Sequence, residues 1–153
     1  MDMPMKQKQT WVLIADARRA RVFESRGKGT GLTAVQDMAL DAELSPSRAL
    51  GTDRPGRTFE SVGSARHAME DPSDPHREQK RQFAQRIARA VHDRHVAKSF
   101  DRLVVVAPAV TMGDLRAALA DDIQAITTAE LVADLTKTPV AELPSHLANI
   151  VDV

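Results

Sequence analysis

The chain has 153 residues, of which 42% are hydrophobic and 27% are charged, a balance typical of one soluble globular domain. Cysteine is absent, which excludes disulfides, thiolate zinc sites and a cysteine nucleophile. The 21 basic residues equal the 21 acidic residues in number, so a cationic field over the whole chain is excluded as well. We expect a single domain over residues 1–153 with an aliphatic core, because only 3% of the residues are aromatic.

No segment is apolar for long enough to indicate export or membrane insertion. Residues 1–10 lack the run of about 7–15 apolar residues that a secretory signal requires. The longest apolar stretches, Val12–Ala15 and Leu103–Val110, are far shorter than the ~20 residues that span a bilayer. We therefore expect a cytoplasmic protein that has no membrane partner.

Three β-type segments come first in the chain. Trp11–Ala15 is a continuous apolar run, and Ala20–Ser25 alternates in polarity. The four residues between these runs are too few for a helical crossover, which predicts an antiparallel hairpin. After a glycine-rich turn, Leu32–Leu40 is expected to form a third, less regular strand.

A long loop and a long helix are expected next. Residues 41–75 are rich in Pro, Gly, Ser and Arg and show no hydrophobic period, which is typical of a functional or disordered loop. Asp74 and Pro75 then supply an N-cap and a first-position proline. Apolar residues at positions 83, 84, 87, 88 and 91 recur at helical spacing, which predicts a helix from about Pro75 to about Ala97.

The segment after this helix reads as a buried strand followed by a short helix. Leu103–Ala107 is apolar on both faces, as in a central parallel strand. Thr111 and Asp114 resemble a capping box, which predicts a helix that begins there and ends at Leu119.

The remaining elements complete the predicted fold. Ile123–Thr127 is the candidate fifth strand, and Thr138–Pro139 begins a last amphipathic helix that Pro144 interrupts. The order of elements predicts a three-layer α/β fold with helices on both faces of a mixed five-stranded sheet. An antiparallel meander followed by two α crossovers is a ribonuclease H-like or, more broadly, Rossmann-like arrangement.

The balanced net charge hides a basic middle segment. Residues 48–98 contain 11 Lys and Arg against 7 Asp and Glu, a net charge of +4. Arginine side chains bind phosphates in a bidentate manner, and the start of a helix offers free N–H groups. This segment is therefore either a solvated polar surface or a phosphate- or RNA-binding site. The candidate residues for such a site are Arg54, Arg57, Arg66, His67, His76, Arg77 and Lys80.

The sequence does not supply a complete catalytic or metal-binding set. Two-metal nuclease chemistry needs carboxylates that converge at strand ends. Asp16 follows the first strand, but no carboxylate directly follows the strand at 103–107, so Asp16 reads as a turn residue. His92 and His95 have helical i, i+3 spacing without a third ligand in register. We predict no catalytic residues, no metal and no cofactor.

Several segments together resemble the bacterial host attachment family, the proteins required for attachment to host cells. The segments are TWVLIADARRARVFES, RPGRTFESVGSARHAMEDPSDPHREQKRQFAQRIA, LVVVAPAVTMGDLRAAL and ADLTKTPVAELPSHL. The resemblance covers nearly the whole chain in the same order. It implies no particular biochemical activity, because the family takes its name from an attachment phenotype.

That family is similar in turn to the central domain of archaeal and eukaryotic class-1 peptide-chain release factors. The similarity implies a ribonuclease H-like sheet with a long loop before a long helix. In release factors this loop has a Gly-Gly-Gln sequence that reaches the peptidyl-tRNA ester. The comparable segment here, Val62–His67, has a single glycine, and no glutamine occurs between Arg57 and Pro75. We therefore do not expect hydrolysis by the release-factor mechanism.

These observations favour a non-catalytic, translation-associated protein that binds RNA or the ribosome through the candidate residues above. One alternative is a hydrolase, either a nuclease or an esterase, that uses Asp16 with loop histidines. Another is an interaction protein that acts in adhesion, as the family name suggests. The edge of the strand expected at Leu32–Leu40 is free to pair with a second copy, which leaves a homodimer open.

Overall fold

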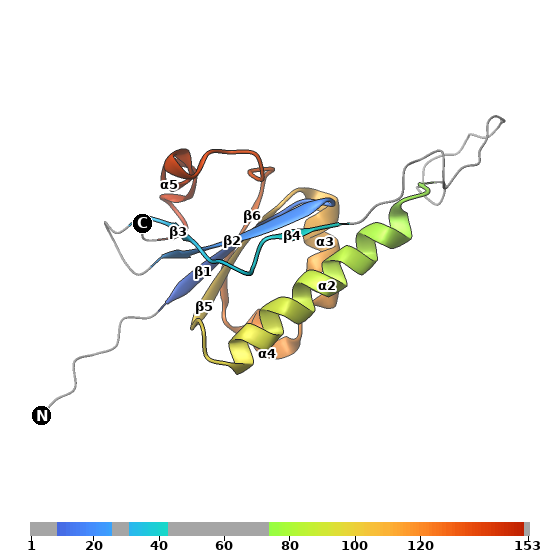
Figure 1. Ribbon diagram of the computed structural model, residues 1–153, viewed down its shortest axis with the longest axis horizontal. Helices are drawn as coiled ribbons and strands as arrows, with labels where there is room; N and C mark the ends of the chain where they lie inside the picture. The colour runs from blue at the N-terminus through green and yellow to red at the C-terminus, as the bar shows by residue number, and fades with distance from the viewer. Residues whose placement is uncertain (1–8, 26–30, 43–73, 152–153) are drawn as a thin grey trace, which may run out of the picture.

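Figure 1 shows the computed structural model of the chain, in which the described residues are 9–25, 31–42 and 74–151. They form one mixed sheet with strand order β3-β2-β1-β5-β6, and β4 also pairs with β2. Its four longer strands are β1 (Thr10–Ala15), β2 (Arg19–Ser25), β5 (Arg102–Ala107) and β6 (Thr127–Val132). β1 and β2 form the predicted antiparallel hairpin, and β5 and β6 lie parallel to β1 on its other side. The predicted α/β class is confirmed.

The two central strands have side chains buried on both faces of the sheet. In β1, Trp11 and Leu13 belong to one buried cluster, whereas Val12 and Ile14 belong to a second. Its residues 11–15 are all apolar because no residue of a central strand covered on both sides faces water. Burial of a side chain such as that of Ile14, which is 0% exposed, stabilises the fold by about 1.5–3 kcal/mol.

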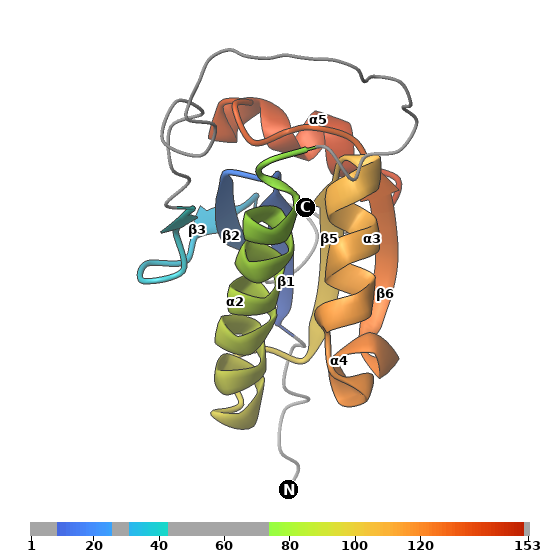
Figure 2. The same cartoon turned by 90° about the vertical axis from the view of Figure 1, so that its right-hand side faces the viewer.

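Helices cover both faces, as predicted. The first cluster is covered by α2 (Arg77–Val96), α3 (Ala109–Ala118) and α4 (Asp121–Ala125). The 3₁₀ helix η3 (Val140–Glu142) leads into α5 (Leu143–Leu147), whose two buried leucines pack in the second cluster. α2 and α3 lie side by side in Figure 2. Among the described helices, none combines the length and the apolar character needed to cross a membrane.

The expected third strand is instead two very short strands, β3 (Thr33–Ala34) and β4 (Leu40–Asp41). Both pair with β2, which makes the sheet six-stranded. The chain between them turns away at Asp37, whose φ of 72° lies in the left-handed region. Met38, which is 2% exposed, reaches the core from this turn, so the apolar residues of the segment reflect burial rather than one regular strand.

Two expectations for the segment after β5 are wrong. α3 begins at Ala109, directly after Pro108, so Thr111 and Asp114 lie inside the helix and do not form a capping box. The strand expected over Ile123–Thr127 is mostly the short helix α4, and β6 begins only at residue 127. Two aspartates in the first turn of α4 favour a helix there because they complement its dipole.

The last expected helix is short and interrupted. Pro144 lies in the first turn of α5, where a proline is tolerated because no intrahelical N–H bond is lost. Val140, in the 3₁₀ helix before α5, is 38% exposed. The predicted long loop over residues 41–75 lies outside the described residues between positions 43 and 73.

Candidate functional site: a charged cavity at one edge of the sheet

The carboxyl ends of β1 and β5 meet at one edge of the sheet, where the first turns of α2 and α3 also lie (Figure 2). Open α/β sheets bind ligands at this edge, outside the carboxyl ends of their parallel strands. A cavity of about 710 Å³ is present there, which is within the range of small-molecule binding sites. We call it the edge cavity.

The residues that line the edge cavity come from four parts of the fold. The turn after β1, the start of α2 and the start of α3 all contribute, together with the residue that joins β5 to α3. The lining residues are Asp16, Ala17, Arg18, Asp74, His76, Arg77, Lys80, Pro108, Val110 and Thr111.

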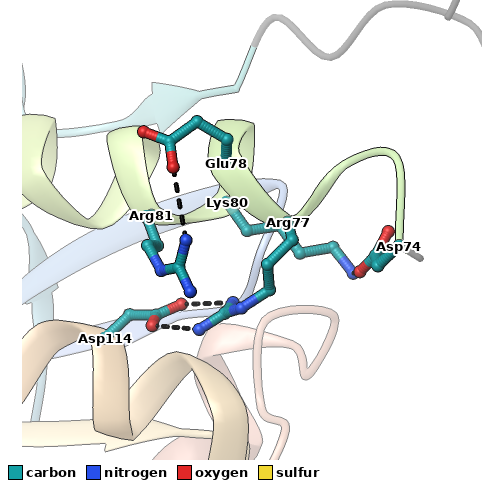
Figure 3. A network of polar contacts seen from close by, with 6 residues as sticks. All are labelled: Asp74, Arg77, Glu78, Lys80, Arg81 and Asp114. Carbon is teal, nitrogen blue, oxygen red and sulfur yellow. Dashed lines mark hydrogen bonds and ion pairs between the residues drawn. The ribbon is translucent and has the colours of Figure 1, made fainter. Parts of the chain in front are cut away.

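Asp74 and Lys80 form an ion pair at the start of α2. The Lys80 Nζ atom lies 3.0 Å from Asp74 Oδ2, and the His76 backbone N–H donates to Asp74 Oδ1 over 2.9 Å. The His76 N–H and the Lys80 ammonium hold the pKa of the Asp74 carboxyl below its ordinary value of 3.8. Although Lys80 lies in phase with the apolar stripe of the helix, its head group thus turns toward the cavity end of α2 (Figure 3).

Arg77 joins α2 to α3 through a bidentate ion pair. Its two terminal nitrogens lie 2.6 and 2.9 Å from the two carboxylate oxygens of Asp114, and the two side chains are only 24% and 11% exposed. Paired N–H···O bonds of this geometry are strong and directional. Figure 3 shows that the contact spans the two helices. The guanidinium therefore sits at a fixed position at the cavity wall.

Arg18 is a cation of the cavity that the sequence-based reasoning did not single out. Its side chain is exposed, and it has no ion pair within the described part of the chain, in contrast to Lys80. The signal that could have found it is its position, because it lies in the turn directly after a central strand, where α/β folds place ligand-binding groups.

The first turn of α3 adds backbone donors to the same wall. The first intrahelical bond of α3 runs from the Met112 N–H to the Pro108 carbonyl. The N–H groups of residues 109–111 precede that bond and have no partner inside the helix. The positive end of the helix dipole therefore points to the edge cavity, where it favours an anion.

Asp16 has a structural role in this site. Its Oδ1 atom accepts the backbone N–H groups of Arg18 and Arg19 over 2.7 and 2.8 Å. The Thr136 hydroxyl lies 2.9 Å from Asp16 Oδ2 and also 2.9 Å from Asp134 Oδ1. Asp16 therefore closes the β1–β2 turn and links it to the segment after β6, in agreement with its prediction as a turn residue.

The two histidines spaced i, i+3 lie near the far end of α2. His92 Nε2 and His95 Nδ1 lie 3.6 and 3.7 Å from the same Oδ2 atom of Asp122 in α4. Within the described ranges, no group of three or more His, Cys, Asp or Glu side chains is arranged to hold a metal ion.

Of the predicted site residues, the structure brings three together at the edge cavity. His76, Arg77 and Lys80 all line it. The other four lie in the segment at positions 43–73, outside the described residues, and remain predictions: Arg54, Arg57, Arg66 and His67. The sequence did not indicate that Asp74 would pair with Lys80 or that Asp114 would pair with Arg77.

The order of the strands and the placement of the helices are similar to those of a translation factor of known structure. The fold is similar to that of the archaeal translation termination factor aRF1, with a TM-score of 0.50 and 10% sequence identity over 92% of this chain. The match covers 38% of the termination factor. At this identity the similarity shows a shared fold and carries no activity across.

The chain itself belongs to the family described as protein required for attachment to host cells, whose family model matches residues 11–147. The resemblance drawn from the sequence is confirmed by this match. No curated protein matches the sequence significantly. The family description names an attachment phenotype and neither a reaction nor a ligand.

Proposed function

We propose that this protein is a non-catalytic RNA- or ribosome-binding protein that acts in translation and contacts phosphate groups at the edge cavity. The observation that carries the proposal is the composition of the cavity wall. Arg18, Arg77 and Lys80 meet the first turns of two helices there. Guanidinium groups and helix N-termini both bind phosphate oxygens.

The fold gives independent support. A similar protein of known structure is a translation termination factor, and the basic segment at residues 48–98 includes the whole of α2. The arginines at 54, 57 and 66 and the histidine at 67 would extend the phosphate contacts from this segment. A cytoplasmic location is part of the same proposal, because translation takes place there.

The hydrolase alternative has less support. Both carboxylate oxygens of Asp16 are engaged by the turn amides and the Thr136 hydroxyl, which leaves the side chain fixed as a structural acceptor. The adhesion alternative is supported only by the family description.

Salt-dependent co-sedimentation with ribosomes tests the proposal. We expect the protein to sediment with ribosomes at low salt and to be released as salt rises, because phosphate contacts displace counterions. Arg18→Ala should weaken binding about 3–10-fold and lower the salt slope by about 1. The triple change of Arg54, Arg57 and Arg66 to Ala should weaken it further.

The matched control is Arg116→Ala, which removes an exposed arginine of α3 whose partner is Glu130 on β6. This variant should sediment like the wild-type protein. Absence of co-sedimentation at low salt, or equal binding by the Arg18 variant and the wild type, would show that the edge cavity does not bind the ribosome.

A further inference from the structure

We infer that the RNA partner is base-paired and that the exposed face of α2 binds its backbone, an inference that rests on the proposed function. The face consists of five exposed residues, which we call the α2 belt: Arg81, Gln82, Gln85, Arg86 and Arg89. It begins one residue after Lys80, so it continues directly from the edge cavity.

The α2 belt lies in a stretch of helix without acidic residues. Between Glu78 and Asp93 the chain has four Lys and Arg and no Asp or Glu. A helix rises about 1.5 Å per residue, which places Arg81 and Arg89 about 12 Å apart along the axis. Successive phosphates of one strand of a DNA duplex rise about 3.4 Å along its axis, and those of an A-form RNA duplex rise less, so a belt of this length spans several phosphates.

One of the belt arginines, Arg86, is held in place by another part of the fold. The Arg86 Nη1 atom donates to the Asp41 carbonyl over 3.0 Å, and its guanidinium lies 5.6 Å from the centre of the Phe83 ring. Arg81 Nη1 lies 3.3 Å from Glu78 Oε1 in an exposed i, i+3 pair within α2 itself, so only Arg86 is preorganised by tertiary contacts. Such preorganisation lowers the entropy lost when a ligand is bound.

The burial of the aromatic residues favours base-paired over unpaired RNA as the partner. Proteins that bind single strands stack the bases on exposed aromatic rings. Every aromatic residue in the described part of the chain is buried, with no more than 4% exposed: Trp11, Phe23, Phe83 and Phe100. An RNA duplex instead presents phosphates and 2′-hydroxyls at its surface.

The exposed glutamine amides of the α2 belt can form hydrogen bonds with the 2′-hydroxyls of an RNA duplex. Gln82 and Gln85 stand between the arginines, and a glutamine amide both donates and accepts hydrogen bonds. A 2′-hydroxyl does the same. The belt therefore combines cations for phosphates with neutral amides for ribose, and the deep, narrow major groove of an RNA duplex keeps these side chains away from the base edges.

Fluorescence anisotropy with a labelled RNA duplex of ~16 base pairs, and with one of its strands alone, tests the inference. We expect the full-length protein to bind the duplex about tenfold more tightly than the single strand, because the strand gains no stacking. Arg89→Ala should weaken duplex binding about 3–10-fold and lower the salt slope by about 1. Arg116→Ala should change neither value.

The outcomes separate this inference from the proposed function. Equal or tighter binding of the single strand, or unchanged duplex binding by Arg89→Ala, overturns the inference while RNA binding itself stands. Absence of binding to both RNAs and to ribosomes at low salt overturns the proposed function and the inference together. A DNA duplex of the same sequence, bound as tightly as the RNA duplex, overturns the role given to the 2′-hydroxyls and with it the inference, because the α2 belt would then bind the backbone of any duplex.

Discussion

At the scale of single residues, the edge cavity is a site in which charges are mostly balanced. Lys80 and Arg77 each face a carboxylate from within the chain, and Arg18 adds an exposed cation beside them. A ligand phosphate would therefore compete with Asp74 for Lys80, whereas it would meet Arg18 directly. This arrangement makes the affinity of the site depend on Asp74 as well as on the cations.

The Asp74 carboxylate gives a pH-dependent contribution to stability. Its pKa is lowered from 3.8 in the folded protein, so folding is stabilised by the ionised form. The contribution is complete above the ordinary pKa and is lost as the pH falls through the lowered value. Asp74→Asn should therefore reduce the free energy of unfolding at neutral pH, and the deficit should shrink as the pH falls below 3.8.

Urea unfolding of both proteins across this pH range measures the deficit. Glu78→Gln is the control, because Glu78 is an exposed acid of the same helix in a surface ion pair with Arg81, and such pairs contribute about 0–1 kcal/mol. A deficit for Asp74→Asn that is independent of pH would contradict the prediction.

At the scale of elements, the packed strands β1 and β5 support the residues that line the edge cavity. The two strands are parallel neighbours, with Ile14 opposite Val106 in register, and both side chains are 0% exposed. The residues that follow these strands line the edge cavity. The position of the turn after β1 therefore depends on the packing of the strand.

Truncation of a central side chain tests whether β1 is packed in the core. Ile14→Ala should lower the free energy of unfolding by about 2–5 kcal/mol, because a fully enclosed side chain leaves a cavity. Val132→Ala, at a position of β6 that is 57% exposed, should change it by less than about 0.5 kcal/mol. Chemical denaturation measures both values, and a similar small loss in the two variants would contradict the assignment of β1 to the core.

At the scale of the whole molecule, two segments far apart in the sequence are fastened together beside the site. Thr136, which is 1% exposed, contacts Asp16 across 120 positions of the chain. Arg21 adds a second link, because its Nη1 atom donates to the Thr136 carbonyl over 2.9 Å. These bonds attach the segment after β6 to the β1–β2 hairpin.

Removal of the Thr136 hydroxyl should loosen this attachment. Thr136→Val keeps the shape and deletes the hydrogen bonds of the hydroxyl to Asp16 and Asp134, whereas the bond from Arg21 to the Thr136 carbonyl remains, so we expect a loss of about 1–2 kcal/mol in unfolding free energy. The backbone N–H groups of Arg18 and Arg19 should also exchange with solvent faster. Thr128→Val, on an exposed position of β6, is the control. Unchanged exchange at both amides would show that Thr136 does not hold the turn.

The sequence alone determined the class of the fold. Continuous apolar runs such as Leu103–Ala107 have no polar face, which requires a strand buried on both sides, and the stripe of α2 requires a helix packed on a sheet. It also located His76, Arg77 and Lys80 at the start of that helix. These conclusions depend on local periodicity, which is a property of neighbouring residues.

Which charged side chains meet depends on how the helices and strands pack. The partners of Lys80 and Arg77 are 6 and 37 positions away, and Asp16 and Thr136 are separated by 120. No periodicity links such positions, because their distance is set by how the helices and strands pack. The short elements β3, β4 and α4 also depend on packing. Each has too few residues for local preference to determine its structure, and the burial of side chains such as Met38 and Ile123 determines it instead.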